Sequence, residues 1–387
     1  MPILLVSHGC WLYKYAVDEG NEILHSSVQA PEVVQYASFD NRTGLLYVAC
    51  SDGGAYAPGR SHYLLSVDVR SEHLRIRGAV AALPDRPIHV AVDPRRGRLL
   101  VAYNRPPGLS VHQLKMDGTI GGLIASGNPA EAHYPHQILL LPFRADVTLV
   151  CRGSDQTASQ AELPGSLRSF ELDNGKLVER SVTAPYGGFG FGPRNATYDP
   201  LSSTVYLSLE RQNKLAGLRL TEAGFDPDFK FMMSSLEGPQ AFKPQLAGAL
   251  RMHPHHRILY QLNRTHFTAG GDPDKYGGEG ENTVVAYRLS RDGTAPSVIQ
   301  RVTTEGIHPR TLSLDDSGRL MAIANLRAQK MQIDGREDQV PPCISLFSVA
   351  ADGRVSFLKR FSLPSDGLPF WSSFASDVDV QARMHAD

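Results

Sequence analysis

The sequence is poor in cysteine and has no long apolar segment. Its 387 residues contain four cysteines, far apart and without a Cys-x-x-Cys pair, so neither a compact zinc site nor a disulfide framework is predicted. The longest wholly apolar stretches are far shorter than the roughly 20 residues that cross a bilayer, and the first residues show no basic leader followed by an apolar segment. We therefore expect a cytoplasmic protein with buried free thiols and no membrane partner.

Neither sign of charge is in excess. Lysine and arginine total 39 against 40 for aspartate and glutamate, so no overall field attracts the protein to nucleic acid or to an anionic membrane. We expect no nucleic-acid partner, and any preference for an anion must arise locally. The Gly-x-Ser-x-Gly pattern of serine hydrolases is also absent, and no motif indicates a nucleotide or another cofactor.

Turn-forming residues, in contrast, are abundant. The chain contains 35 glycines and 26 prolines, and one phrase recurs, in which an aliphatic run is followed by a turn on Asp, Pro, Ser or Gly and by a second apolar run. Six copies are visible, with the second turn residue at positions 41, 94, 142, 200, 254 and 316. A repeat of about 55 residues made of short strands fits a four-stranded propeller blade, and seven such units fill the chain.

The seventh unit is predicted to form from both ends of the chain. Residues 3–7, 11–18 and 23–28 are expected as three strands, and residues 368–375 as the innermost fourth. Closure by both termini removes the exposed edges of an open sheet. The sequence thus predicts an all-β fold, a seven-bladed β-propeller of four-stranded antiparallel blades, as a single domain over residues 1–387.

This geometry sorts residues between two faces. The tight turns between the first and second strands define one face, and residues one strand away lie on the other. There we expect His89, His136, Arg194, His308 and Arg310 at first-strand starts, and Asn104, Arg105, Glu210, Asn263, Arg264 and Asn325 at second-strand ends. The long connections 51–62, 152–165, 265–280 and 326–342 fall on the same face, where they would surround a pocket.

A purely structural role is the alternative for each of these residues. Arg and Asn at blade starts can tie neighbouring blades together through backbone hydrogen bonds. For the group this explanation is weaker, because several unpaired charges are costly to hold near a narrow channel.

Two further motifs are weaker candidates for a site. His253, His255 and His256 have metal-like spacing, but they fall on the turn face without a carboxylate, so no metal site is predicted there. The glycines at 187, 188, 190 and 192 precede no helix, and we expect a crossing between blades rather than a phosphate cradle.

The rim residues lie in short stretches that read Tyr134-Pro135-His136-Gln137, Gly190-Phe191-Gly192-Pro193-Arg194-Asn195, Tyr206-Leu207-Ser208-Leu209-Glu210, Leu262-Asn263-Arg264, and His308-Pro309-Arg310 followed by Ala324-Asn325. These stretches resemble the seven-bladed propeller lactonase family, which includes bacterial 6-phosphogluconolactonases and fungal carboxymuconate-lactonizing enzymes. The resemblance implies a central cavity lined by His136, Arg194, Glu210 and Arg264. Asn195 departs from the family phrase Gly-Pro-Arg-His, a departure that concerns the substrate more than the fold.

The chemistry of these groups suits a lactone. Opening or closing a lactone requires a group that moves a proton and a cationic site for a carboxylate or a developing oxyanion. Glu210 or His136 would be the base and the other would return the proton, while Arg194 and Arg264 hold the anion. Further substrate contacts are expected from Arg310, His308, Asn263, Asn325, Asn195 and His89.

Three functions stay open on this evidence. The first is metal-independent hydrolysis of a sugar-acid lactone, as part of carbohydrate metabolism. The second is a cycloisomerase acting on a carboxymuconate-like dicarboxylate, in which a substrate carboxylate attacks its own double bond beside the same four residues. The third is a non-catalytic propeller that binds a partner at its rim. Under both enzymatic hypotheses the partner is a small anionic or lactone substrate. The chain is expected to be a monomer or a weak homo-oligomer.

Overall fold

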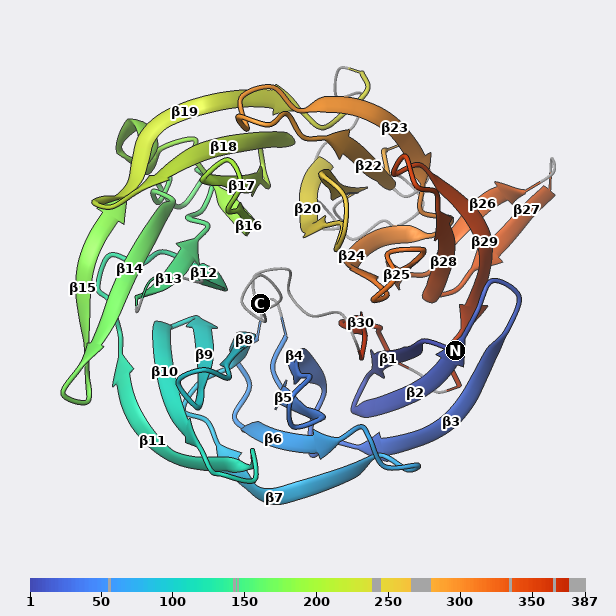
Figure 1. The fold of residues 1–387 in the computed structure, drawn as a ribbon, viewed down its shortest axis with the longest axis horizontal. Helices are drawn as coiled ribbons and strands as arrows, with labels where there is room; N and C mark the ends of the chain where they lie inside the picture. The colour runs from blue at the N-terminus through green and yellow to red at the C-terminus, as the bar shows by residue number, and fades with distance from the viewer. Residues whose placement is uncertain are drawn as a thin grey trace.

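A ring of blades surrounds one axis in the computed structural model of the protein (Figure 1). The structure describes residues 1–54, 57–141, 144, 146–238, 245–265, 280–333, 336–364 and 367–375, with only the backbone described between 329 and 340.

Seven four-stranded antiparallel sheets form the ring. From the axis outwards, the first three blades are β30 (Ser372–Phe374), β1 (Ile3–His8), β2 (Trp11–Val17) and β3 (Glu22–Gln29); β4 (Val34–Asp40), β5 (Leu45–Ser51), β6 (His62–Asp68) and β7 (Arg75–Ala82); and β8 (Pro87–Asp93), β9 (Arg98–Asn104), β10 (Pro107–Leu114) and β11 (Ile120–Gly127). The next two are β12 (Pro135–Leu140), β13 (Val147–Cys151), β14 (Ser166–Asp173) and β15 (Lys176–Thr183), and β16 (Pro193–Asp199), β17 (Thr204–Leu209), β18 (Lys214–Thr221) and β19 (Gly224–Ser234). The last two are β20 (Gln245–Met252), β21 (Ile258–Thr265), β22 (Thr283–Arg288) and β23 (Ser297–Thr303), and β24 (Ile307–Leu314), β25 (Leu320–Arg327), β28 (Cys343–Val349) and β29 (Val355–Ser362). The expectation of a seven-bladed β-propeller is confirmed.

Strand sequences match their places in the blades. Every residue of β5, β17 and β21 is buried, because a neighbouring blade covers each face of these second strands. The outermost strands β7 and β15 instead expose many of their side chains. The described residues contain one helical segment, the 3-10 turn η1 (Pro185–Gly188), which lies in the glycine-rich crossing between blades four and five. Among these residues no helix has the length and apolar character needed to span a bilayer.

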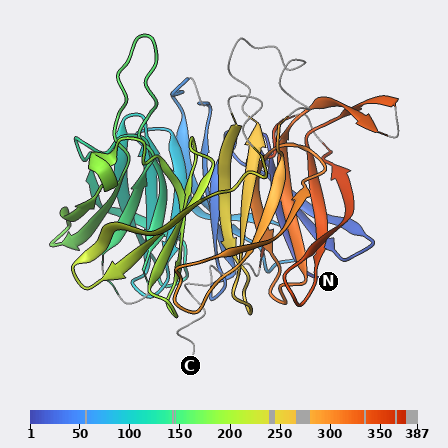
Figure 2. The ribbon, with the colours of Figure 1, turned by 90° about the horizontal axis from the view of Figure 1, so that it is seen from above.

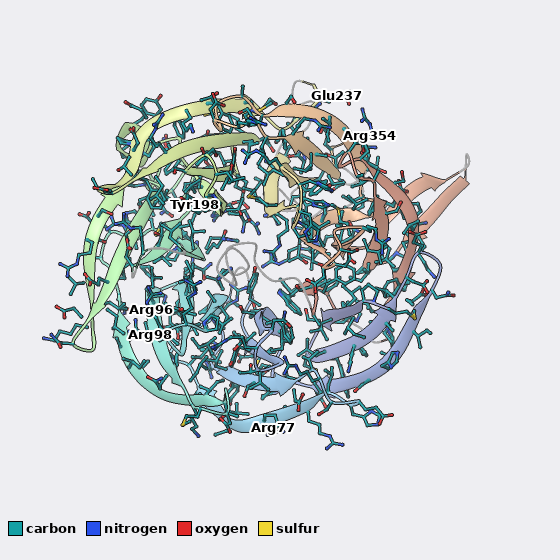
Figure 3. All side chains as sticks on the ribbon, viewed as in Figure 1. Arg77, Arg96, Arg98, Tyr198, Glu237 and Arg354 are labelled. Atoms are coloured by element: carbon teal, nitrogen blue, oxygen red, sulfur yellow. The ribbon has the colours of Figure 1, made fainter. Side chains whose placement is uncertain are left out.

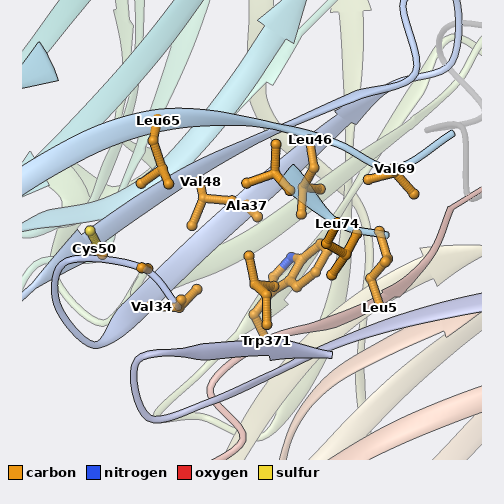
Figure 4. Packing of buried hydrophobic residues seen from close by; sticks show 13 residues of the cluster. Leu5, Val34, Ala37, Leu46, Val48, Cys50, Leu65, Val69, Leu74 and Trp371 are labelled. Atoms are coloured by element: carbon orange, nitrogen blue, oxygen red, sulfur yellow. The ribbon is translucent and has the colours of Figure 1, made fainter. Parts of the chain in front are cut away.

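The two termini close the ring as expected. Strand β30 pairs antiparallel with β1, and the Ser7 amide donates a hydrogen bond to the Trp371 carbonyl at 2.8 Å. This closing strand is shorter than the sequence suggested, since it covers Ser372–Phe374 only. Figure 4 shows Trp371 and Leu5 packed against Val34, Ala37 and other apolar side chains, so the closure joins the first and second blades through a shared core.

The tight turns between first and second strands are organised by aspartate side chains. Asp40 Oδ1 accepts a hydrogen bond from the Arg42 amide at 2.9 Å, and Asp199 Oδ2 accepts one from the Ser202 hydroxyl at 2.6 Å. Such side-chain contacts are the reason that aspartate favours turns. Of the expected turn at 141–143, residues 142 and 143 lie outside the described residues.

The long connections rise from the opposite face (Figure 2). The 152–165 loop (green) and the hairpin of β26 (Gln329–Ile333) and β27 (Arg336–Val340) (orange) stand on this face, which we call the mouth. The expected loop at 265–280 falls mostly outside the described residues.

Candidate active site at the channel mouth

A bulge at the start of the first strand selects a side chain that is presented at the mouth in blades four, five and seven. Between β12 and β13, Pro135 pairs with Cys151 and Gln137 with Val150, which leaves His136 without a partner. The same register shift leaves Arg194 unpaired in blade five and Arg310 in blade seven. A bulge of this kind bends the strand and re-aims a side chain, and bulges are common beside active sites.

Glu210 forms the centre of the polar cluster at the mouth. It directly follows β17 and is only 2% exposed. Its Oε1 accepts a hydrogen bond from Arg264 Nη2 at 2.6 Å and lies 2.8 Å from Arg194 Nε, an ionic contact without the alignment of a hydrogen bond. Its Oε2 accepts a hydrogen bond from Arg152 Nη1 at 2.5 Å. One buried carboxylate therefore binds three guanidinium groups that come from blades four, five and six.

This arrangement fixes the charge of Glu210. Burial alone would raise the pKa of the carboxyl, but Arg152, Arg194 and Arg264 together lower it well below its ordinary value of 4.5. A carboxylate with such a low pKa is a weak proton acceptor at neutral pH. Glu210 is suited to anchoring the three cations rather than to moving protons.

His136 differs from Glu210 in its charge and in its contacts. Burial, followed by repulsion from Arg194, lowers its pKa well below 6.5, so the imidazole is uncharged at neutral pH. Its Nδ1 is buried and has no hydrogen-bond partner among the described residues. A neutral imidazole at the edge of a cationic cluster has a lone pair available to accept a proton.

The 152–165 loop contacts this cluster through two of its residues, Arg152 and Asp155. Arg152 begins the loop and its guanidinium also lies over the ring of Tyr134, with 5.7 Å between Cζ and the ring centroid. Asp155 of the same loop forms an ion pair with Arg211, the residue after Glu210. The loop therefore acts as one wall of the mouth.

Arg310 and Arg86 form a second cationic group beside the first. The Arg310 guanidinium lies over the ring of Phe370, 4.8 Å from its centroid. Arg86, which is 5% exposed, donates two hydrogen bonds to Gln35 Oε1, from Nε at 3.0 Å and from Nη2 at 2.6 Å. Among the described residues, neither arginine has a carboxylate within ion-pair distance.

Asn195 supports the site from below. It accepts a hydrogen bond from Arg194 Nη1 at 2.5 Å and donates one to Gln137 Oε1 at 3.1 Å. Gln137 in turn accepts a hydrogen bond from the Ala196 amide at 2.7 Å. These contacts join the innermost strands of blades four and five just below the arginines, so Asn195 orients Arg194.

Two further histidines expected at the mouth are held by contacts within the protein. His89 lies one position beyond the bulge of its strand, where the unpaired residue is Ile88. Its ring packs 4.2 Å from that of Tyr36, and burial, followed by Arg251, lowers its pKa to about 3. His308 donates from Nδ1 to the Thr265 carbonyl at 2.6 Å, which holds the ring against β21.

Two of the three asparagines expected to contact substrate have structural partners. Asn263 accepts a hydrogen bond from the Ser235 hydroxyl at 2.7 Å and donates to the Ser235 carbonyl at 3.0 Å. Asn325 donates to Ser345 Oγ at 2.9 Å and to the Thr304 carbonyl at 3.3 Å. Both amides are fully buried and connect the end of a second strand to other segments, which fits the structural alternative for these residues.

The remaining rim residues lie at the edge of the cluster. Arg105 donates a hydrogen bond to the Tyr134 hydroxyl and its guanidinium lies over the same ring. It therefore supports Tyr134, whose ring the Arg152 guanidinium also covers. Asn104 is the last residue of β9 and is partly buried, with its backbone paired to Pro107.

The histidine cluster and the glycine-rich crossing play structural roles. His253 Nδ1 accepts hydrogen bonds from the amides of His255 and His256, and its Nε2 donates to the Gly318 carbonyl at 3.1 Å. Within the described part of the chain, no group of three or more His, Cys, Asp or Glu side chains is arranged to hold a metal ion. Gly188 has a positive φ and its carbonyl accepts a hydrogen bond from the Gly165 amide, so the crossing packs against the 152–165 loop.

A separate cavity of about 450 Å³ lies between the outer strands of blades three and four. Its walls include Leu109, Phe170, Leu177 and the Arg168–Glu179 ion pair, in which the charged atoms are 2.7 Å apart.

Comparison with known proteins identifies the family. The family described as "Lactonase, 7-bladed beta-propeller" matches residues 7–340, most of the chain. The chain belongs to this family.

Solved structures agree on the architecture of this lactonase-family propeller. A protein from Lactobacillus plantarum is 18% identical with a TM-score of 0.71, and the match covers 96% of this chain and 99% of that one. A protein described as a putative 6-phosphogluconolactonase from Bacteroides fragilis is 14% identical with a TM-score of 0.67, covering 96% and 97%. The periplasmic gluconolactonase of Pseudomonas aeruginosa is 17% identical with a TM-score of 0.68, covering 97% and 99%. At these identities the likeness shows the shared fold. No curated protein matches the sequence.

Sequence reasoning missed Arg152 in this lactonase-family site. The signal was present, because Arg152 directly follows the second strand of blade four, as Glu210 follows that of blade five. In the sequence it stands only as the first residue of the long 152–165 connection.

Proposed function

We propose that the protein hydrolyses a lactone of the sugar-acid type at the channel mouth, with His136 as the general base and Arg152, Arg194 and Arg264 as the anion-binding groups. The observation that carries the proposal is the pairing of an uncharged imidazole with three guanidinium groups held by one buried carboxylate. Membership of the lactonase family supports the reaction class.

The division of labour follows from the contacts of the two groups. Both carboxylate oxygens of Glu210 are engaged by guanidinium groups. The His136 imidazole is uncharged, and its buried Nδ1 has no hydrogen-bond partner among the described residues, so a ring nitrogen can accept a proton from water. We therefore assign proton transfer to His136 and the positioning of the arginines to Glu210.

The steps balance with one water molecule. His136 accepts a proton from water, and the resulting hydroxide attacks the lactone carbonyl carbon. The carbonyl oxygen becomes an oxyanion that a guanidinium of the cluster stabilises. The tetrahedral intermediate then collapses, the ring C–O bond breaks, and the imidazolium returns its proton to the leaving alkoxide. The product is a hydroxy acid, whose carboxylate is also a suitable ligand for arginine.

A panel of lactones tests the proposal. Acid release from sugar-acid lactones, followed with a pH indicator, should be accelerated by the protein above the uncatalysed rate. His136→Ala should lower kcat by about 100- to 10,000-fold, the range for loss of a general base. The matched control is His73→Ala, which removes an exposed histidine and should leave kcat unchanged. Full activity in the His136 variant would remove the assignment of the base.

The alternatives are separate outcomes of the same assay. Loss of ultraviolet absorbance from a carboxymuconate-like dicarboxylate, without turnover of sugar-acid lactones, would favour the cycloisomerase. No turnover in either panel, together with a specific protein partner that co-purifies, would favour the binding scaffold.

A further inference from the structure

The cavity between the outer strands of blades three and four is large enough for a small molecule. Its volume is about 450 Å³, and ligand sites typically occupy about 300 to 1,000 Å³. Gly127 at the end of β11 and Ala130 in the crossing to β12 line it, and their small size leaves this space open. None of the lining residues belongs to the Glu210 cluster, so the cavity is a candidate for a separate binding site.

Part of the cavity wall is apolar. Leu109 of β10, Phe170 of β14 and Leu177 of β15 contribute to it. The same side chains belong to the hydrophobic core that joins the two blades. Since burial of apolar surface is favourable, this part of the wall favours a ligand with an aliphatic or aromatic group.

A buried arginine also lines the cavity. The Arg168 side chain is only 8% exposed. Its Nε donates a hydrogen bond to Ser166 Oγ at 3.2 Å, and its Nη1 donates one to Glu179 Oε2 at 2.7 Å. Among the described residues its Nη2 donates no hydrogen bond, and Glu131 Oε2 lies 3.6 Å away. Arg168 therefore has an N–H group left for a ligand carboxylate.

Two glutamates outnumber this arginine in the cavity. Glu179 is 34% exposed and binds Arg168 through one oxygen, and Glu131 is 84% exposed and accepts no hydrogen bond among the described residues. One positive and two negative groups leave a net negative charge. A purely anionic ligand is therefore disfavoured, whereas an ammonium group has two carboxylates that can accept its N–H groups.

We propose that this cavity binds a free α-amino acid with an apolar side chain. The ligand carboxylate accepts a hydrogen bond from Arg168 Nη2, and the ligand ammonium donates to Glu131 and Glu179. The apolar side chain packs against Phe170 and Leu177. Neither a plain carboxylic acid nor a plain amine matches all three parts of the cavity. The proposal does not depend on the proposed lactone hydrolysis.

Calorimetry with four probes tests each part of this assignment. L-Phenylalanine carries all three groups, whereas hydrocinnamate lacks the ammonium, phenethylamine lacks the carboxylate and glycine lacks the apolar side chain. We expect phenylalanine to bind at least about tenfold more tightly than each of the others, since each of them loses a charge-assisted hydrogen bond or the apolar contact. Equal or tighter binding of hydrocinnamate or phenethylamine, or no binding of phenylalanine, would overturn the proposal.

A cavity-filling variant tests the location of the site. Gly127 has no positive φ, and a Cβ at this position would lie 3.7 Å from Leu177 Cδ1, so the backbone accommodates a side chain here. Gly127→Val should weaken phenylalanine binding at least about fivefold, because the valine methyl groups and the ligand compete for the same space. Full affinity in this variant would place the ligand elsewhere and overturn the proposal.

A charge variant tests the ammonium contact without altering the shape of the cavity. Glu131→Gln should weaken phenylalanine binding by about two- to fivefold, the effect of losing an exposed ion pair, and should not weaken hydrocinnamate binding. The matched control is Glu237→Gln, which removes the same charge from an exposed residue at the outer edge of the ring, well apart from blades three and four (Figure 3). Equal losses in the two variants, or no loss in Glu131→Gln, would contradict the ammonium contact and overturn the proposal.

Discussion

Glu210 Oε1 and Arg264 Nη2 lie 2.6 Å apart, although the two residues are separated by 54 positions in the sequence and belong to adjacent blades. This ion pair joins the second strands of blades five and six at the mouth. Since Arg152 and Arg194 contact the same carboxylate, Glu210 connects three blades through one buried charge.

Removing the charge of Glu210 should therefore destabilise the folded protein. We expect Glu210→Gln to lower the free energy of unfolding by about 3–5 kcal/mol, the cost of leaving buried partner charges uncompensated. Urea titration measures the change. The matched control is Glu179→Gln, which breaks the Arg168 ion pair at a side chain that is 34% exposed and should cost about 1 kcal/mol or less. Similar losses in both variants would contradict the central role of Glu210.

Replacing Arg194 by lysine should impair catalysis with little change in net charge. Lysine cannot reach Asn195 Oδ1 and Glu210 at once with a planar fork, so the anion site loses its orientation. We expect kcat/KM for a lactone substrate to fall at least about tenfold. Arg168→Lys is the control, because this residue lines the cavity between blades three and four and should leave kcat/KM unchanged. An unaffected Arg194 variant would argue against an anion-binding role.

Asn263 should affect stability and not substrate binding. Its amide is engaged by Ser235, and Asn263→Ala would leave buried polar groups unpaired. We expect a loss of about 1–3 kcal/mol in the free energy of unfolding, with KM within about threefold of wild type. A large increase in KM without loss of stability would restore Asn263 as a substrate contact.

Acid should destabilise the fold through its buried histidines. Burial is the largest cause that lowers the pKa of His89 to about 3 and of His253 to about 4, and it holds those of His136 and His308 well below 6.5. These histidines therefore bind protons near pH 6.5 in the unfolded chain but not in the folded chain. As a result, the free energy of unfolding falls as the pH drops from 6.5 towards 4. As the pH drops through this window, each such histidine lowers the free energy of unfolding by up to about 1.4 kcal/mol per pH unit. Above the window it has no such effect.

Urea titrations at several pH values measure this slope. We expect His89→Asn to have a smaller slope than wild type. The difference should correspond to about one bound proton, because the variant has no imidazole at this position to titrate in the unfolded chain. A free energy of unfolding that is constant between pH 7 and pH 5 would contradict the burial of these groups.

The architecture followed from the sequence because the repeat is carried by short local patterns. Turns with Asp at their first position, such as those at Asp40 and Asp199, mark the start of the second strand in several blades. Counting strands from these turns was enough to place Glu210, Arg194 and Arg264 on one face and to assign the closing strand to the C-terminal segment.

The details of the site depended on register, which the sequence does not reveal. His89 and His136 occupy similar places in the repeat, but the bulge falls on Ile88 in one strand and on His136 in the other. A shift of one residue in a strand changes which side chain faces the axis. Arg152 was overlooked for a related reason, because a residue at a strand end can belong either to the site or to the loop that follows.

The most direct test is a crystal structure of the His136→Ala variant soaked with a sugar-acid lactone that the wild-type protein hydrolyses. The account predicts lactone density at the mouth, with the carbonyl oxygen within about 3 Å of a guanidinium of the Glu210 cluster, the donor distance for oxyanion stabilisation. Lactone density only in the cavity between blades three and four, beside Arg168, would contradict it.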